Sequence, residues 1–355
     1  MNLLRNRYRD GVASIAVVPD CPFPSVEVHN PRTLLDNCPV DKPTALTLSE
    51  DIADLASVGR VWIKDERTRM GLGSFKALGA AYVIASDAAN SAATNTADAL
   101  SGVTYVTASA GNHGMSVAAG AGVFGARAMI FIAETVPESF ARRLGDKGAE
   151  VVRAGHNYEA SMDAAKKVAE REGWRLLSDS SWAGYFDAPY RLMEGYLVLL
   201  DEVFEQIDDV PTHIFLQAGV GGLAGAIAAL ARARWHDVPT IVVVEPDAAP
   251  ALFDSVRAGK PVAVSGPVSS MGRLDCKEPS LIALKGLARD ADFFATITDE
   301  EAAAAMPALD KAGFATTPSG GAGLAALLAS EPHRATLGLD SESRVLTILS
   351  EGPEE

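Results

Sequence analysis

Short apolar runs alternate with longer helix-like stretches through most of the 355-residue sequence, and this alternation limits the possible folds more than any other feature. The apolar runs are strand-sized, and the stretches between them are long enough for helices. Repeated strand–helix units build parallel sheets with helices on both faces, so the sequence predicts an α/β protein. The expected strands cover residues 61–63, 104–108, 128–133, 150–154, 175–178, 214–217, 241–244 and 345–349. The expected helices cover 75–86, 113–124, 138–147, 158–172 and 190–207, and another begins at 222.

Charge and cysteine content argue against several classes of protein. The formal net charge is -15, which disfavours binding to nucleic acid or to an anionic membrane. No apolar stretch reaches the ~20 residues that span a bilayer, and the N-terminal segment lacks the apolar core of a signal peptide. Cys21, Cys38 and Cys276 are odd in number and have no CxxC spacing, so neither a disulfide framework nor a metal site is indicated. We expect a cytoplasmic protein.

Ligands of open α/β sheets bind at the carboxyl ends of strands, where loops lead into helices. Four segments of this sequence occupy such positions: residues 71–76, 107–114, 217–225 and 350–352. We therefore expect the site residues to lie in these four segments.

The segment QAGVGGLAG, residues 217–225, follows a strand and opens a helix. Its glycines leave the backbone bare, and bare N–H groups at a helix N-terminus bind phosphate. The spacing departs from a strict dinucleotide fingerprint, because alanine stands at 224 where the third glycine would be. Close packing of a helix on a strand explains the same glycines equally well.

The segment GLGSFKALG, residues 71–79, places Lys76 at the start of an expected helix, directly after an apolar Phe75. Most lysines are simply solvated. A lysine here can instead form a Schiff base with an aldehyde cofactor. A third segment, TASAGNHG at 107–114, fits either an ordinary helix N-terminus or the floor of an anion pocket.

Taken in order, these three motifs resemble those of the fold-type II pyridoxal-phosphate enzymes, the superfamily of threonine and serine dehydratases. SFK resembles the Schiff-base motif of that family, SAGNHG its asparagine loop and AGVGGLAG its phosphate loop, and the similarity extends from about residue 62 to 352. Within the superfamily the chain is most similar to the diaminopropionate ammonia-lyases. The segments that carry this similarity are RMGLGSFKALGAAY, DSSWAGYFDAPYRLMEGY, THIFLQAGVGGLAG, VVEPD, CKEPS and LSEG.

The resemblance implies a tryptophan synthase β-like fold, in which two open, twisted, mainly parallel sheets are flanked by helices. It implies a large cofactor-binding domain, residues 1–85 plus 190–355, and a small substrate-side domain, residues 86–189. It also implies pyridoxal 5'-phosphate as the cofactor, a small amino acid as the substrate and a homodimeric assembly.

The resemblance further assigns roles to individual residues. Lys76 would carry the cofactor and shuttle the Cα proton, and Asn112 would bind the 3'-oxygen of the cofactor. Ser350 would face the pyridine nitrogen. The substrate carboxylate would be held by Ser109, Ala110, Gly111, Asn112 and His113, and the phosphate by Gly219, Val220, Gly221, Gly222 and Leu223.

Asp179 lies in LLSDSSW, at the carboxyl end of an expected strand. From the residues alone, a helix cap or loop acid is as good an interpretation as a catalytic acid. The resemblance favours an acid–base role. Tyr158, Trp182, Tyr185 and Asp187 are candidates for lining the pocket, and Cys276 and Glu278 are expected beside it.

A hydroxyl at Ser350 is a weaker partner for the pyridine nitrogen than a carboxylate, and this favours β-elimination over transamination. We therefore expect an ammonia-lyase of amino-acid catabolism, acting on a small β-substituted amino acid such as 2,3-diaminopropionate and giving pyruvate and ammonia. One position departs from the ammonia-lyase pattern: Ala110 stands where DGNHG has aspartate, and a methyl group cannot hold a second ammonium.

Several alternatives stay open at this point. Ala110 allows hydroxyl as the leaving group, as in a serine, threonine or 3-hydroxy amino acid dehydratase. A β-replacement enzyme is disfavoured because its lysine motif tends towards SVKDR, whereas this chain has SFKAL. A non-catalytic protein that binds pyridoxal phosphate would retain the same motifs, and a nucleotide-binding protein fits least well.

Overall fold

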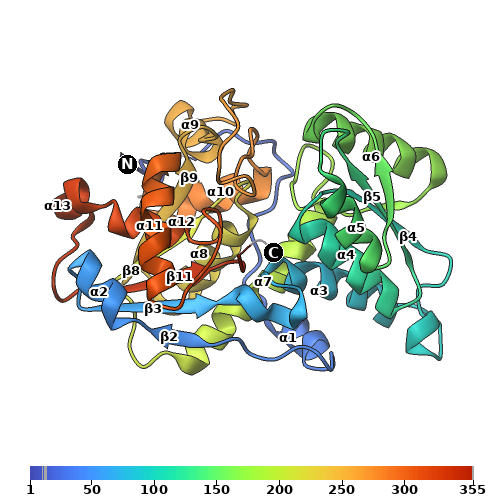
Figure 1. Cartoon of the computed structure of the whole chain (residues 1–355), viewed down its shortest axis with the longest axis horizontal. Coiled ribbons are helices and arrows are strands. Elements are labelled where there is room, and N and C mark those ends of the chain that lie inside the picture. The colour runs from blue at the N-terminus through green and yellow to red at the C-terminus, as the bar shows by residue number, and fades with distance from the viewer. Residues whose placement is uncertain (10, 12–13, 354–355) are drawn as a thin grey trace.

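The computed structural model describes residues 1–9, 11 and 14–353, so residues 10, 12–13 and 354–355 of the predicted large domain lie outside the described residues. Two separate β-sheets, one of seven strands and one of four, lie side by side, each with its own helices (Figure 1). The observed architecture confirms the predicted α/β fold class.

The seven-stranded sheet has the order β1-β10-β9-β8-β11-β3-β2. Its five inner strands are mutually parallel, and β1 and β2 pair antiparallel at the two edges. The strands are β1 (Asn2–Arg5), β2 (Leu46–Leu48), β3 (Arg60–Asp65), β8 (His213–Gln217), β9 (Thr240–Pro246), β10 (Phe293–Ile297) and β11 (Arg344–Leu349).

Strand β8 shows why this sheet has helices on both faces. Ile214 and Leu216 belong to one hydrophobic cluster, and Phe215 between them belongs to another. Since successive side chains of a strand point to opposite faces, both faces are buried. The helices of this part are α1 (His29–Leu35), α2 (Glu50–Ala56), α7 (Asp187–Gln206), α8 (Gly222–Trp235), α9 (Ala251–Ala258), α10 (Leu281–Asp290), α11 (Asp299–Lys311), α12 (Ala322–Leu328) and α13 (Arg334–Leu337).

The four-stranded sheet is parallel throughout, in the order β6-β5-β4-β7. Tyr105 and Val106, neighbours on β4, again enter different clusters, so this smaller sheet is also covered on two faces. Its strands are β4 (Thr104–Ala108), β5 (Arg127–Ile132), β6 (Glu150–Arg153) and β7 (Arg175–Leu176). Its helices are α4 (Asn112–Val123), α5 (Glu138–Asp146) and α6 (Tyr158–Glu172), and α3 (Lys76–Ala89) packs on both α4 and α7.

All eight expected strands and all six expected helices are present, with ends shifted by three residues or fewer. The described residues also contain three short 3₁₀ helices, η1 (Glu66–Gly71), η2 (Thr96–Asp98) and η3 (Glu331–His333). The predicted domain boundaries at 85 and 190 stay a prediction. Within the described residues, no helix is both long and apolar enough to cross a membrane, and no group of three His, Cys, Asp or Glu side chains is arranged to hold a metal ion.

Candidate active site

Lys76 is the first residue of α3, at the end of a tightly turned loop that follows β3. Gly71 and Gly73 take positive φ angles of 67° and 79°, which glycine adopts without strain. The loop is tied to the end of β11, since Phe75 N–H donates to the carbonyl of Ser350 (3.2 Å) and Ser74 forms a β-bridge with Glu351. The fold therefore fixes the position from which the lysine side chain extends.

A buried ionic cluster anchors the beginning of the same loop. The guanidinium of Arg69, within η1, binds Glu66 Oε2 through Nε (2.8 Å) and Glu202 Oε1 on α7 (2.7 Å). All three side chains are almost completely buried. Removing one partner of such a cluster would leave a buried charge uncompensated, so it holds η1 firmly against α7.

The Lys76 ammonium forms an ion pair with Oδ2 of Asp179. Burial disfavours the charged form of each group, but the attraction between the two charges outweighs it, raising the pKa of Lys76 and holding the pKa of Asp179 well below its usual value. The side chains of Lys76 and Asp179 keep 21% and 15% of their full solvent exposure, respectively. The predicted catalytic pair is thus in direct contact and partly accessible to solvent.

His113 is the second residue of α4 (Asn112–Val123) and is buried. Its Nε2 is 2.8 Å from the carbonyl oxygen of Leu177, two residues before Asp179. Burial lowers the pKa of His113, so a neutral ring that donates from Nε2 fits this contact. His113 therefore supports the segment that carries Asp179.

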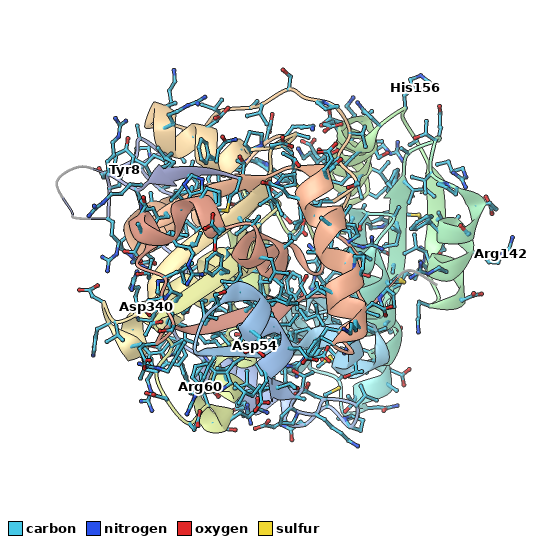
Figure 2. The ribbon with its side chains drawn as sticks, turned by 60° about the vertical axis from the view of Figure 1, so that its left-hand side comes forward. Tyr8, Asp54, Arg60, Arg142, His156 and Asp340 are labelled. Carbon is cyan, nitrogen blue, oxygen red and sulfur yellow. The ribbon has the colours of Figure 1, made fainter. Side chains whose placement is uncertain are left out.

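By contrast, His156 projects from the outer surface of the part that contains the four-stranded sheet, with 94% of its side chain exposed (Figure 2).

The loop from Ser109 to Gly111 connects β4 to α4. Ser109 Oγ accepts the Gly111 N–H (3.2 Å), and no side chain caps the helix at Gly111. Asn112 begins α4, and its amide donates to Oε2 of Glu351. Ala110 packs its methyl group against the hydrophobic cluster of the smaller sheet. The loop offers backbone groups and an amide, but residue 110 contributes no charge.

The glycine loop after β8 forms a cradle with an uncapped helix end. Gly221 precedes α8 with φ 97°, and no side chain caps this helix of 14 residues. A Cβ on Gly219 would lie 2.9 Å from Cys276 Sγ, and one on Gly221 would lie 2.9 Å from Leu252 Cδ1. Bare N–H groups therefore start α8, which is the donor set that a phosphate requires.

The cradle and the ion pair belong to one site. A Cβ on Gly222 would lie 3.9 Å from the Asp179 carbonyl oxygen and 3.6 Å from Tyr196 Cε2. The buried hydroxyls of Ser74, two residues before Lys76, and of Tyr196, beside Gly222, have no hydrogen-bond partner among the described residues. A lysine amine, an uncapped helix N-terminus and unsatisfied hydroxyls together fit an aldehyde cofactor that carries a phosphate.

Glu351 is a site residue that the sequence reasoning missed, although it lies in LSEG directly after Ser350. Its Oε1 accepts from Thr317 Oγ1, and its Oε2 accepts from Asn112 and pairs with Arg273 Nε at 2.8 Å. Burial raises the pKa of Glu351, and Arg273 opposes the shift. Its position after a strand end was the one sequence signal that could have identified Glu351 as a site residue. Its partners could not be identified in this way, because they are distant in sequence.

Some of the remaining candidate residues lie close to the Lys76–Asp179 pair, and others are exposed. Cys276 is beside Gly219, and burial raises the pKa of its thiol to about 12. Tyr158, the first residue of α6, is exposed. Trp182 and Tyr185 stack with ring centroids 4.3 Å apart. Glu278 and Asp187 are exposed.

Comparisons with known proteins agree over most of the chain. A model of the family described as "Pyridoxal-phosphate dependent enzyme" matches residues 39–351. The diaminopropionate ammonia-lyase of Salmonella typhimurium is 32% identical over 345 residues, covering 87% of this chain and 85% of the relative. The L-serine dehydratase/L-threonine deaminase of Mus musculus is 30% identical over 249 residues, covering 69% and 72%.

A solved structure of Escherichia coli diaminopropionate ammonia lyase, in complex with an aminoacrylate-PLP azomethine reaction intermediate, superposes with a TM-score of 0.86. The two chains are 28% identical, and the match covers 99% of this chain and 93% of the other. Maize serine racemase, at 23% identity and a TM-score of 0.78, shares the fold.

Proposed function

Since this chain belongs to the family of pyridoxal-phosphate dependent enzymes, we propose that it is a lyase that eliminates the β-substituent of a small amino acid. The products are a 2-keto acid and ammonia, and the leaving group is a second ammonia or water. The observation that carries this proposal is the Lys76–Asp179 ion pair beside the Gly219–Gly222 cradle. A reactive amine, an acid–base partner and a phosphate site occur together there.

Pyridoxal phosphate, when bound, supplies an aldehyde that condenses with amines and a ring that withdraws electrons from the substrate Cα. Lys76 would hold its aldehyde carbon. The backbone N–H groups of residues 219–223 would hold its phosphate, and the Asn112 amide would hold its 3'-oxygen. Ser350, buried at the end of β11, would offer a neutral hydroxyl to the ring nitrogen.

Asp179 and Lys76 are placed to move protons between them. The Lys76 ammonium must lose a proton before its nitrogen can act as a nucleophile or base. Oδ2 of Asp179 is in contact with Nζ and can accept that proton. We therefore assign Asp179 the role of holding a proton for Lys76 and returning it to the leaving group.

The substrate carboxylate would bind the loop of residues 109–113, where α4 begins without a side-chain cap. We propose a small, L-configured substrate, because Asp179 remains beside Lys76 whereas Ala110 replaces the loop aspartate of the ammonia-lyase pattern. The diaminopropionate ammonia-lyases among the relatives support 2,3-diaminopropionate. Ala110, packed into an apolar cluster, supports the second candidate, a serine, threonine or 3-hydroxy amino acid.

We also propose that the protein works in the cytoplasm as a homodimer, with domains of residues 1–85 plus 190–355 and 86–189. The free state of all three cysteines supports a reducing compartment. The family resemblance supports the dimer. Light scattering of the purified protein tests it, since a monomeric mass at micromolar concentration contradicts the proposal.

The decisive test of the function has two parts. Purified protein with pyridoxal phosphate should show the visible absorbance of a lysine-bound cofactor, and that band should be lost in Lys76→Ala. The loaded protein should then release keto acid from at least one substrate among the 2,3-diaminopropionate enantiomers, serine, threonine and 3-hydroxyaspartate. A protein that binds the cofactor but processes none of them is a binding protein rather than this lyase.

A further inference from the structure

Glu351 joins three separate segments at the edge of the site. Thr317, before α12, and Asn112, which begins α4, each donate a hydrogen bond to the Glu351 carboxyl group. Arg273, between α9 and α10, forms an ion pair with the same group. The side chain keeps only 6% of its exposure. Because two hydrogen-bond donors and a guanidinium contact it, the group is bonded as a carboxylate.

The backbone of Glu351 is attached to the loop that carries Lys76. Glu351 forms a β-bridge with Ser74, and Gly352 N–H donates to the Gly73 carbonyl (3.0 Å). Its side chain reaches Asn112, which belongs to the helices of the smaller sheet. Glu351 is therefore a direct link between the lysine loop and the asparagine loop.

We propose that Glu351 is a positioning residue, which fixes the Asn112 amide and places a second negative charge near Lys76. An amide whose N–H is held by a buried carboxylate cannot rotate without leaving that carboxylate partly unsatisfied. The remaining amide groups of Asn112 consequently keep fixed directions, as required of a group that orients a cofactor. This inference rests on the proposed function.

The negative charge of Glu351 should also favour the protonated form of the Lys76 nitrogen, and this effect can be measured separately from cofactor binding. Asp179 contacts Nζ of Lys76 directly, whereas Glu351 lies farther away and is bridged to Ser74, two residues before Lys76. Arg273 partly compensates the Glu351 charge. The titratable groups near Lys76 or Asp179 include His113, Tyr158, Tyr185, Tyr196 and Cys276. Neutralising Glu351 removes a negative charge near Lys76, so it should disfavour a protonated nitrogen at Lys76.

The test uses the holoenzyme and three variants. Glu351→Gln removes the charge with little change in shape, Glu351→Asp retains the charge, and Glu342→Gln changes an exposed glutamate before the same strand, β11, as a control. For each protein we would titrate the visible band of the lysine-bound cofactor against pH and measure the dissociation constant of pyridoxal phosphate.

We expect the spectral midpoint of Glu351→Gln to fall by roughly one pH unit and its cofactor affinity to fall roughly 10-fold. Glu351→Asp should keep a midpoint near that of the wild type, and Glu342→Gln should match the wild type. In an Asn112→Ala background, Glu351→Gln should weaken cofactor binding no further, because it acts through Asn112. An additive loss in that background overturns the link through Asn112.

The two proposals fail in distinguishable ways. If the wild type forms no visible band with pyridoxal phosphate, the proposed function is wrong, and the role of Glu351 falls with it. If the wild type forms the band and releases keto acid, but Glu351→Gln has the same midpoint and affinity as the wild type, only the role of Glu351 is wrong.

Discussion

Asp179→Asn is the substitution that most sharply separates a catalytic role from a structural one for this carboxylate. It replaces the ion-pair partner of Lys76 with a neutral side chain of almost the same shape. The amide can still contact Nζ, so the main change is the loss of one charge. Asp54→Asn, an exposed change on α2, provides the matched control (Figure 2).

The magnitude follows from the contact and its burial. Two unit charges about 4 Å apart attract each other by about 4 kcal/mol at an effective dielectric constant of about 20. The remaining exposure of Lys76 and Asp179, 21% and 15%, admits solvent that screens part of this energy. One pKa unit is worth about 1.4 kcal/mol, so we expect the pKa of Lys76 to fall by roughly 2 units in the variant.

Uptake of pyridoxal phosphate by the apoprotein measures this change, because only the neutral amine of Lys76 reacts. The uptake rate should rise with pH in both proteins, with its midpoint roughly 2 units lower in Asp179→Asn. Keto-acid release should nevertheless fall by roughly 10²–10⁴-fold, since the group that holds the proton is lost. Near-normal release by Asp179→Asn, with the control unchanged, would refute the acid–base assignment.

Three other predictions follow from the same geometry. Gly221→Ala forces an alanine into φ 97° with its Cβ 2.9 Å from Leu252 Cδ1, so calorimetry should show weaker cofactor binding, and urea unfolding a loss of about 1–3 kcal/mol. Ala110→Asp should raise the ratio of 2,3-diaminopropionate to serine turnover, measured as kcat/KM; an unchanged ratio would contradict a substrate-reading role for residue 110. The lowered pKa of Asp179 adds stability that is present above its usual pKa near 4 and lost at lower pH, so acid should destabilise the wild type more than Asp179→Asn in urea titrations.

The parallel core was predictable because its strands are buried on both faces and therefore form continuous apolar runs, as in β8, β9 and β11. The edge strands β1 and β2 were not predicted, since each is short and only partly buried. Strand β10, FFATI, is fully buried and carries the same apolar signal, so the sequence could have revealed it.

The site was predictable as far as strand ends and glycine patterns define it. Lys76 and Asp179, both singled out from the sequence, are in contact although 103 residues separate them. Glu351 could not be identified in the same way, because its partner Asn112 is 239 residues away and its burial arises only when the two sheets come together. Local sequence pattern identifies where loops leave strands, but it does not show which side chains of different loops meet.

The most direct test of the central claim is the absorbance of the purified chain with pyridoxal phosphate, recorded for the wild type and for Lys76→Ala. A visible band in the wild type that is absent from Lys76→Ala, while both proteins remain folded by circular dichroism, is the result expected if Lys76 carries the cofactor. A wild-type protein that stays colourless after reconstitution, or a Lys76→Ala variant that keeps the same band, would contradict it.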